Sequence, residues 1–219
     1  MKSKLEMYEL PLFPLNVVLF PGMPLPLHIF EDRYKEMMAD CIREGQPFGI
    51  IHLEESTDDD DPMIGDIAVG CTAEIAQVQP LDQGRMLIMA IGRERFRVVE
   101  FNHDKPYLVG LVAPAPLNVE DEIVEQGQVE GLEPLITEYL NKLAIVGNVD
   151  VEAHQIPTDP EELIYMAATL IQLPTADKKA FLALDRASEL TRRLQQSYRR
   201  ELSLMQTIPS EDIGIFSLN

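Results

Sequence analysis

The chain is 219 residues long and strongly acidic, with 37 acidic residues against 18 basic ones and a formal net charge of -19. A surface of this charge repels phosphate backbones and anionic lipids, so it disfavours general binding to nucleic acid or to membranes. No apolar run free of proline is long enough to cross a bilayer, and acidic residues interrupt the N-terminal stretch where a signal peptide has its apolar core. We therefore expect a cytoplasmic protein.

The cysteine content argues against a disulfide framework. Cys41 and Cys71 are the two cysteines of the chain. In a cytoplasmic protein such a pair is expected to be reduced and packed in the core. An isolated pair also lacks the ligand spacing of a metal site. We predict no disulfide, no metal ion and no cofactor.

An apolar, proline-rich stretch, Leu10–Tyr34, opens the folded part of the chain. Its prolines exclude a helix, because each lacks a backbone N–H and pushes the preceding residue towards extended geometry. We predict strands at Asn16–Phe20 and Leu25–Phe30, joined by a turn at Pro21–Gly22 where glycine permits a positive φ. Strands that are apolar at nearly every position are expected to lie buried in a barrel or sandwich.

Regular hydrophobic patterns follow this stretch. Residues Glu31–Glu44 carry apolar side chains at helical spacing, and Gly45 is typical of a helix C-terminus. Together with the two strands above, the pattern predicts about seven strands and one helix before Pro114–Pro116, with the short connections of a pseudo-barrel. The further strands are expected at Phe48–Leu53, 67–78, Arg85–Ile91, Arg93–Phe101 and Tyr107–Ala113.

The rest of the chain has helical patterns. A helix from Glu120 has its firm part at Pro134–Ile145, and Asp159 followed by Pro160 is typical of a helix start. The apolar side of the last helix needs the earlier helices as packing partners, which predicts a bundle. The three later helices are expected at 160–173, at 175–184 with Thr175 as cap, and from Asp185 as cap to about 205. The sequence thus predicts an α+β chain of two subdomains, residues 1–116 and 117–219.

Two blocks of this sequence resemble a known family. The first is Leu10–Gly22 followed by Leu25–Tyr34, with closely spaced prolines and a Phe-Glu-x-Arg-Tyr sequence. The second combines Gly70–Ile75, the turn Asp82–Arg85 and Gly92–Val98. Both resemble the N-terminal, substrate-binding domain of Lon proteases. The resemblance implies a PUA-like β pseudo-barrel followed by a helical bundle, which full-length Lon uses to engage polypeptide substrates.

Departures from full-length Lon shape the expected function. Full-length Lon continues into an ATPase and a Ser-Lys protease, whereas this sequence ends at Asn219 and has no Gly-Lys-Ser/Thr phosphate loop. No serine or histidine has a recognisable nucleophile or base context, so no catalytic residue is predicted. We expect a stand-alone module that binds unfolded or partly folded polypeptides for recognition or as an adaptor. A separate ATPase or protease is a candidate partner, and the oligomeric state stays open.

Apolar residues in predicted loops are the candidate polypeptide-binding residues. They are Met23 and Pro24 at the first turn and Met63 beside an acidic loop, since the flexible methionine thioether adapts to varied partners. The alternative interpretation is that these side chains cap the ends of the barrel core.

Clustered charges offer two further hypotheses. Asp58–Asp61 has the oxygen ligands of a hard cation site, but four adjacent carboxylates cannot all point at one ion, which favours a solvated loop. Arg93, Arg95 and Arg97 alternate along one face of a predicted strand. They fit either an RNA-binding PUA-like barrel or ion pairs with neighbouring acidic residues, and the acidic composition favours the ion pairs.

Overall fold

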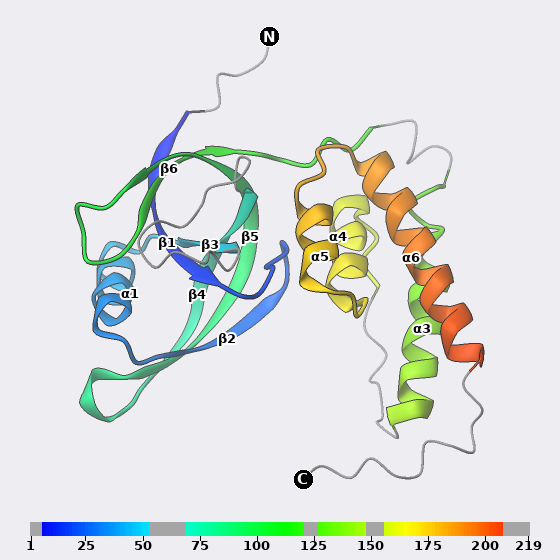
Figure 1. Ribbon diagram of the computed structural model, residues 1–219, viewed down its shortest axis with the longest axis horizontal. Helices are drawn as coiled ribbons and strands as arrows, with labels where there is room; N and C mark the ends of the chain where they lie inside the picture. Colours follow the sequence, from blue (N-terminus) through cyan, green and yellow to red (C-terminus); the bar gives the residue numbers. More distant parts are fainter. Residues whose placement is uncertain (1–5, 53–68, 121–126, 148–155, 208–219) are drawn as a thin grey trace. The chain divides into compact units, whose positions relative to one another are not determined.

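The computed structural model describes residues 6–52, 69–120, 127–147 and 156–207 (Figure 1). Strands come first and helices later, which confirms the predicted α+β class. The chain forms two compact units, each with its own core. The first combines Met1–Leu117 with Leu173–Asp185, and the second combines Asn118–Gln172 with Arg186–Asn219.

The first unit is built on a six-stranded mixed sheet. Its order is β2-β5-β4-β3-β1-β6, and β6 pairs again with β5, so that β5, β4, β3, β1 and β6 close into a ring. β1 and β3 run parallel, whereas the other neighbours run antiparallel. The described strands are β1 (Tyr8–Leu15), β2 (Pro24–Ile29), β3 (Phe48–His52), β4 (Val69–Pro80), β5 (Met86–Asn102) and β6 (Val109–Pro114).

The long strand β5 belongs to two parts of the sheet. From Phe96 onward it pairs with β6 and the start of β4 inside the ring. Its first part, Met86–Ile91, pairs with β2 on one side and with the end of β4 on the other. We call the three-stranded extension made by β2, Met86–Ile91 and Glu74–Pro80 the arm. The sheet is therefore a closed ring that continues into an open arm.

Two apolar clusters hold the first unit together. One fills the ring with Leu10, Leu12, Ile51, Phe96, Val98 and Val112. Glycine makes room for it, because a Cβ added at Gly70 would lie 2.5 Å from Phe96 Cζ. The other joins the outer face of β1, β3 and β4 to helix α1 (Asp32–Glu44), which covers it (Figure 1). Cys41 and Cys71 are free and buried in this second cluster, as predicted.

Most local predictions for the first unit are confirmed, but the first strand was placed wrongly. The helix ends at Gly45 with φ 63°, as its sequence indicated. Asn16–Phe20 is not a strand, and the strand is β1, which contains Pro11 and Pro14. Residues 8–11 of β1 pair with β6 and residues 12–15 pair with β3. Each half of β1 therefore pairs with a neighbouring strand on one side only. A proline whose nitrogen faces the unpaired side costs no hydrogen bond between strands.

The two strands predicted on either side of Gly92 are one continuous strand. At Gly92 the chain before β2 crosses β5 closely, and a Cβ there would lie 2.2 Å from the Phe20 carbonyl oxygen. The Gly92 N–H donates to the Met23 oxygen, and the Gly92 oxygen accepts from the Gly22 N–H, each over 2.9 Å. Gly92 therefore marks the place where the ring becomes the arm, rather than a break. The described residues accordingly hold six strands instead of about seven.

In its described residues the second unit contains three helices: α3 (Leu132–Gly147), α4 (Pro160–Leu170) and α6 (Ala187–Thr207). The predicted packing of the last helix is confirmed, since α6 lies against both α3 and α4. Tyr198 of α6 meets Tyr139 edge to face at 5.3 Å and donates its hydroxyl proton to the Ala167 oxygen over 2.8 Å. The Asp159 side chain caps α4 by accepting from the Glu162 N–H over 3.0 Å, as predicted.

The segment before α6 departs from the sequence prediction. Leu173–Asp185, which contains α5 (Thr175–Leu182), belongs to the sheet unit rather than to a helical subdomain 117–219. Arg95 of β5 contributes to this attachment, because its buried guanidinium donates to the Leu184 oxygen and pairs with Asp185. Asp185 therefore does not cap α6. The carboxylate of Glu120 accepts from the Ser188 N–H instead, over 3.1 Å.

Across residues 6–52, 69–120, 127–147 and 156–207, no helix combines the length and apolar character that a membrane span needs.

Candidate functional site

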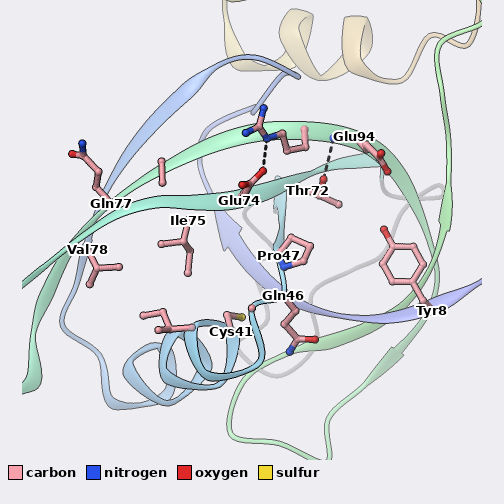
Figure 2. A pocket seen from close by; sticks show the side chains of 14 residues that line it. Tyr8, Cys41, Gln46, Pro47, Thr72, Glu74, Ile75, Gln77, Val78 and Glu94 are labelled. Carbon is pink, nitrogen blue, oxygen red and sulfur yellow. Dashed lines mark hydrogen bonds and ion pairs between the residues drawn. The ribbon is translucent and has the colours of Figure 1, made fainter.

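A groove of about 600 Å³ lies in the first unit between the end of α1 and the arm (Figure 2). Its walls come from α1 and the turn after it, from Thr72–Val78 of β4, from Arg93 and Glu94 of β5, and from Tyr8 at the start of β1. We call it the α1–β4 groove. Its size lies within the usual range for ligand sites.

The groove exists because β3 is shorter than β4. β3 pairs with β4 along Cys71–Ala73, and before Phe48 the chain turns through Gly45–Pro47 into α1. Beyond Ala73, the groove therefore lies where a neighbouring strand would otherwise pair with β4. Strand pairing, rather than any local motif, creates this site.

A β-bulge directs apolar side chains into the groove. Ile75 pairs with Ala90 and Gln77 with Met89, so that one extra residue, Ala76, is inserted on β4. Without it, alternation would place residues 75 and 77 on one face. With the bulge, Ile75 and Val78 both point toward α1, whereas Glu74 and Gln77 point the other way (Figure 2). Bulges commonly re-aim side chains in this manner.

Large apolar side chains are exposed along the groove. Ile42 of α1 and Val78 of β4 are 46% and 40% exposed. On the outer face of the arm, a second groove of about 670 Å³ shares Val78 and is also lined by Leu87, which is 41% exposed. The end of β4 therefore has accessible apolar side chains along both grooves.

The charged groups of the groove are unevenly paired. Arg93 binds Glu74 with 2.6 Å between Nε and Oε2. The Glu94 backbone N–H donates to the Thr72 hydroxyl over 3.0 Å, and its carboxylate has no ion pair within the part of the chain that the structure describes. Burial, and then the charge of Glu94, raises the pKa of Tyr8. The groove thus has a negative end at Glu94.

The groove does not present a reactive thiol. Cys41 lines it, but burial raises the pKa of this thiol to about 12, and the charges of nearby carboxylates add to the effect. At neutral pH the group is therefore protonated and a poor nucleophile. No group of three or more potential metal ligands occurs among the residues described.

The candidate residues from the sequence do not form this groove. Met23 is half-buried and packs against the core between the sheet and α1, while Pro24 is exposed as the first residue of β2. Neither lines the α1–β4 groove. Met63 and the acidic run Asp58–Asp61 lie outside the described residues. Ile42 and Val78 could not be identified from the sequence, because nothing local marks a strand edge.

The arginine stripe is engaged in ion pairs. Arg93 binds Glu74, and both Arg95 and Arg97 bind Asp185. The side chain of Arg95 is fully buried. These contacts confirm that the three arginines pair with acidic residues, and such pairs leave little of the stripe for an RNA backbone.

A second polar cluster stabilises α1. The Tyr107 hydroxyl donates to Asp40 Oδ2 over 2.7 Å and accepts from Lys105 Nζ over 2.8 Å. Arg43 also contacts Asp40, at 2.6 Å. The hydrogen bond from Tyr107 is the main cause that lowers the pKa of Asp40. The cluster joins α1 to the segment before β6, which is a structural role.

The family model described as the ATP-dependent protease La (LON) substrate-binding domain matches residues 9–199. The chain is 27% identical over 176 residues to Lon protease 2 of Myxococcus xanthus, covering 79% of this chain and 21% of that protein. It is 24% identical over 206 residues to a Lon protease of Buchnera aphidicola, covering 92% and 26%. The chain thus spans about a fifth to a quarter of the length of these relatives.

Solved structures share the fold. The N-terminal domain of Mycobacterium avium complex Lon protease superposes with a TM-score of 0.65 at 19% identity, covering 88% of this chain and 98% of that one. A Lon N-terminal domain protein from Xanthomonas campestris superposes with a TM-score of 0.56 at 23% identity, covering 92% and 99%. At these identities the likeness concerns the fold.

Proposed function

Because the chain belongs to the family of ATP-dependent protease La (Lon) substrate-binding domains, we propose that it binds exposed apolar segments of unfolded or partly folded polypeptides. The observation that carries the proposal is the α1–β4 groove. There Ile42 and Val78 are exposed, and Ile75 points into the same space. Burying such side chains against a partner contributes about 25 cal/mol per Å² of apolar surface.

The shape of the groove suits a chain better than a compact ligand. It runs along the end of β4 and shares the lining residues Gln77 and Val78 with the second groove on the arm. An extended segment can follow such a surface and contact several apolar side chains in turn. Of the polar residues that line it, Glu74 and Gln77 are exposed and point away from α1, so they can stay hydrated beside a bound chain.

The proposal extends to a role in proteolysis. The relatives are Lon proteases in which the matched region is about a fifth to a quarter of the protein. We place this domain upstream of an ATP-dependent protease, in the same polypeptide or as a separate partner, where it presents captured segments. Recognition and cleavage are then separate tasks.

Binding to an unfolded protein tests the proposal directly. The probe is fluorescently labelled ribonuclease A that has been reduced and carbamidomethylated, and the control probe is native ribonuclease A with the same net basic character. We expect fluorescence anisotropy to show binding of the unfolded form that largely persists in added salt, since the contact is apolar. Equal binding of the native form would show charge attraction alone and would overturn the proposal.

Matched variants locate the binding surface. Ile42→Asp places a charge in the groove and is expected to weaken binding by about tenfold or more. Val99→Asp is the control, because Val99 is 55% exposed on β5 and does not line the groove. Met23→Asp tests the first turn of the arm. Loss of binding in Met23→Asp with none in Ile42→Asp would assign recognition to that turn instead of the groove.

A further inference from the structure

The end of β4 has an open edge beside the α1–β4 groove. β5 accompanies β4 along its length, but β3 pairs with it at Cys71–Ala73 alone. Within the described parts of the chain, no strand lies on that side of Glu74–Gln79. An unpaired edge presents backbone N–H and C=O groups that form a template for one more strand. The groove therefore borders a place where a strand can add.

The hairpin between β4 and β5 shows which backbone groups face the open side. The Leu81 N–H donates to the Arg85 oxygen over 2.8 Å, so Leu81 faces β5. Backbone groups alternate sides along a strand, which turns Gln79 towards β5 and turns Pro80 and Val78 away from it. Proline at an edge position costs no ladder hydrogen bond, and Pro80 fits that rule. Val78 consequently directs both its N–H and its C=O to the open side.

The side chains beside this edge are apolar. Ile75 and Val78 point from β4 toward α1 (Figure 2), and Ile42 of α1 is exposed in the same groove. An added strand directs alternate side chains to the same face of the sheet, where they meet these residues. Backbone hydrogen bonds then contribute affinity for any extended segment, and the apolar surface selects segments with apolar residues at alternate positions.

The other edge of the arm is protected. β2 pairs with β5, and Pro24 and Pro26 occupy alternate positions of β2. Because β2 pairs with β5 through an ordinary ladder, their ring nitrogens face the free edge. Prolines on an edge are a common protection against unwanted strand pairing. β4 has no proline between Glu74 and Gln79, so the arm blocks one edge and leaves the other available.

The charge of the groove indicates which segment it accepts. Arg93 is paired with Glu74, which leaves the Glu94 carboxylate as the net charge among the described lining residues. The whole chain carries a formal net charge of -19. A segment with a basic residue near Glu94 is attracted, whereas an acidic segment or a second copy of this chain is repelled.

We infer that the α1–β4 groove holds an extended, basic segment of another protein, which adds as a strand to the open edge of β4. The inference rests on the proposed function, because it states how a captured polypeptide is held. Val78 supplies the backbone hydrogen bonds, Ile42 and Ile75 contact alternate apolar side chains, and Glu94 lies beside the basic residue. Strand-forming tendency and charge, rather than one unique sequence, define the partner.

Two substitutions at one residue separate backbone pairing from apolar contact. Val78→Pro removes the N–H that faces the open edge and puts a ring in its place, while Val78→Thr keeps both the N–H and the side-chain shape. The probe is a labelled peptide of sequence Lys-Thr-Val-Thr-Val-Thr-Val-Lys. We expect Val78→Pro to weaken its binding by about tenfold or more, and Val78→Thr to change it by about threefold or less. Thermal unfolding checks that both variants fold.

The outcomes distinguish this inference from the proposed function. If Val78→Pro binds the peptide as tightly as Val78→Thr, strand addition is overturned. If strand addition is overturned but Ile42→Asp still weakens the binding of unfolded ribonuclease A, the proposal of polypeptide binding in the groove stands. If Ile42→Asp binds unfolded ribonuclease A as tightly as the unchanged protein, the proposed function fails at this groove.

Hydrogen exchange in the unchanged chain provides a test without a variant. Addition of the peptide is expected to slow exchange of the Val78 N–H, and no protection of this N–H at saturating peptide would overturn the inference. A peptide with glutamine in place of lysine is expected to bind less tightly, and Glu94→Gln is expected to abolish that difference. Protection of Val78 that grows with protein concentration in the absence of peptide would show a second copy on the edge and overturn the stated partner.

Discussion

The ring and the arm are made from the same two long strands but use their surfaces in opposite ways. In the ring, β4 and β5 have neighbours that close the sheet, and Phe96 fills the interior against glycine backbones. In the arm, the same strands expose Val78 and Leu87, and among the described residues no strand pairs with the other side of β4 there. One pair of strands thus closes the sheet at one end and leaves apolar side chains accessible at the other.

The boundary between the ring and the arm has a defined position on each strand. β4 leaves its neighbour β3 after Ala73, and β5 passes from arm to ring at Gly92. On the ring side of β4, residues Gly70–Ala73 are buried, and on its arm side the residues from Glu74 to Pro80 are exposed, except for the half-buried Ile75. Substitutions in the ring should therefore change stability, whereas substitutions along the open edge should change binding.

The largest expected effect is on the ring, from Gly70→Ala. A Cβ at Gly70 would lie 2.5 Å from both the Ile50 carbonyl oxygen and Phe96 Cζ. Because the Ile50 oxygen is backbone, the ring must deform, and we expect the free energy of unfolding to fall by about 3 kcal/mol. Urea unfolding measures it. Gly45→Asn is the control, since that turn has open space and asparagine tolerates a positive φ. Equal stability of Gly70→Ala and the unchanged protein would contradict the tight packing of the ring.

The next effect concerns the attachment of Leu173–Asp185 to the ring. Arg95→Met keeps the apolar volume but removes the buried guanidinium that contacts Leu184 and Asp185. Hydrogen bonds of charged groups contribute about 2 kcal/mol, so we expect a loss of that size in urea unfolding. Limited proteolysis should also cut within Leu173–Asp185 sooner. Proteolysis unchanged from that of the original protein would show that other contacts hold this segment.

Features determined by nearby residues were predictable from the sequence. The apolar spacing of α1, the left-handed Gly45 at its end and the Asp159 cap before Pro160 each depend on a few neighbouring residues. Hydrophobic periodicity reports such features well. Strand content was likewise predictable, since most of the expected strands lie where alternation of apolar residues placed them.

Features determined by distant partners were not predictable. Pro11 and Pro14 lie within β1 because each half of that strand has a different partner, and a single sequence does not show strand pairing. The same holds for the bulge that turns Val78 into the groove. Arg95 binds an acidic residue 90 positions away, so the sequence indicated the ion pair but not its partner. The candidate site depends on the same long-range pairing, which explains why Met23 and Pro24 were chosen in its place.

A smaller, pH-dependent effect on stability is expected at Asp40, where α1 joins the rest of the first unit. The Tyr107 hydrogen bond and the Arg43 and Lys105 charges lower the pKa of Asp40. The folded state therefore binds fewer protons than the unfolded state, and the stabilisation is present above the ordinary carboxyl pKa of 3.8 and lost as the pH falls through the lowered value. Asp40→Asn should reduce stability at about pH 7 and match the original protein near about pH 2.

Unfolding in urea across this pH range measures the Asp40 effect. The control is Glu100→Gln, an exposed carboxylate of β5 outside the cluster. A constant difference between Asp40→Asn and the original protein at every pH would mean that Asp40 acts through packing rather than through its charge.

The smallest effect on stability is expected where the ring meets the arm, from Arg93→Met. Arg93 and Glu74 have side chains 51% and 59% exposed, and ion pairs of this exposure contribute at most about 0.5 kcal/mol after solvent screening. The substitution nonetheless leaves Glu74 unpaired and makes the groove more negative. We expect urea unfolding to change by about 0.5 kcal/mol or less, while the Lys-containing strand peptide binds about threefold more tightly at low salt. A fall in stability as large as that of Arg95→Met, with no gain in peptide affinity, would contradict the proposed division between a ring that stabilises the fold and an arm that binds a partner.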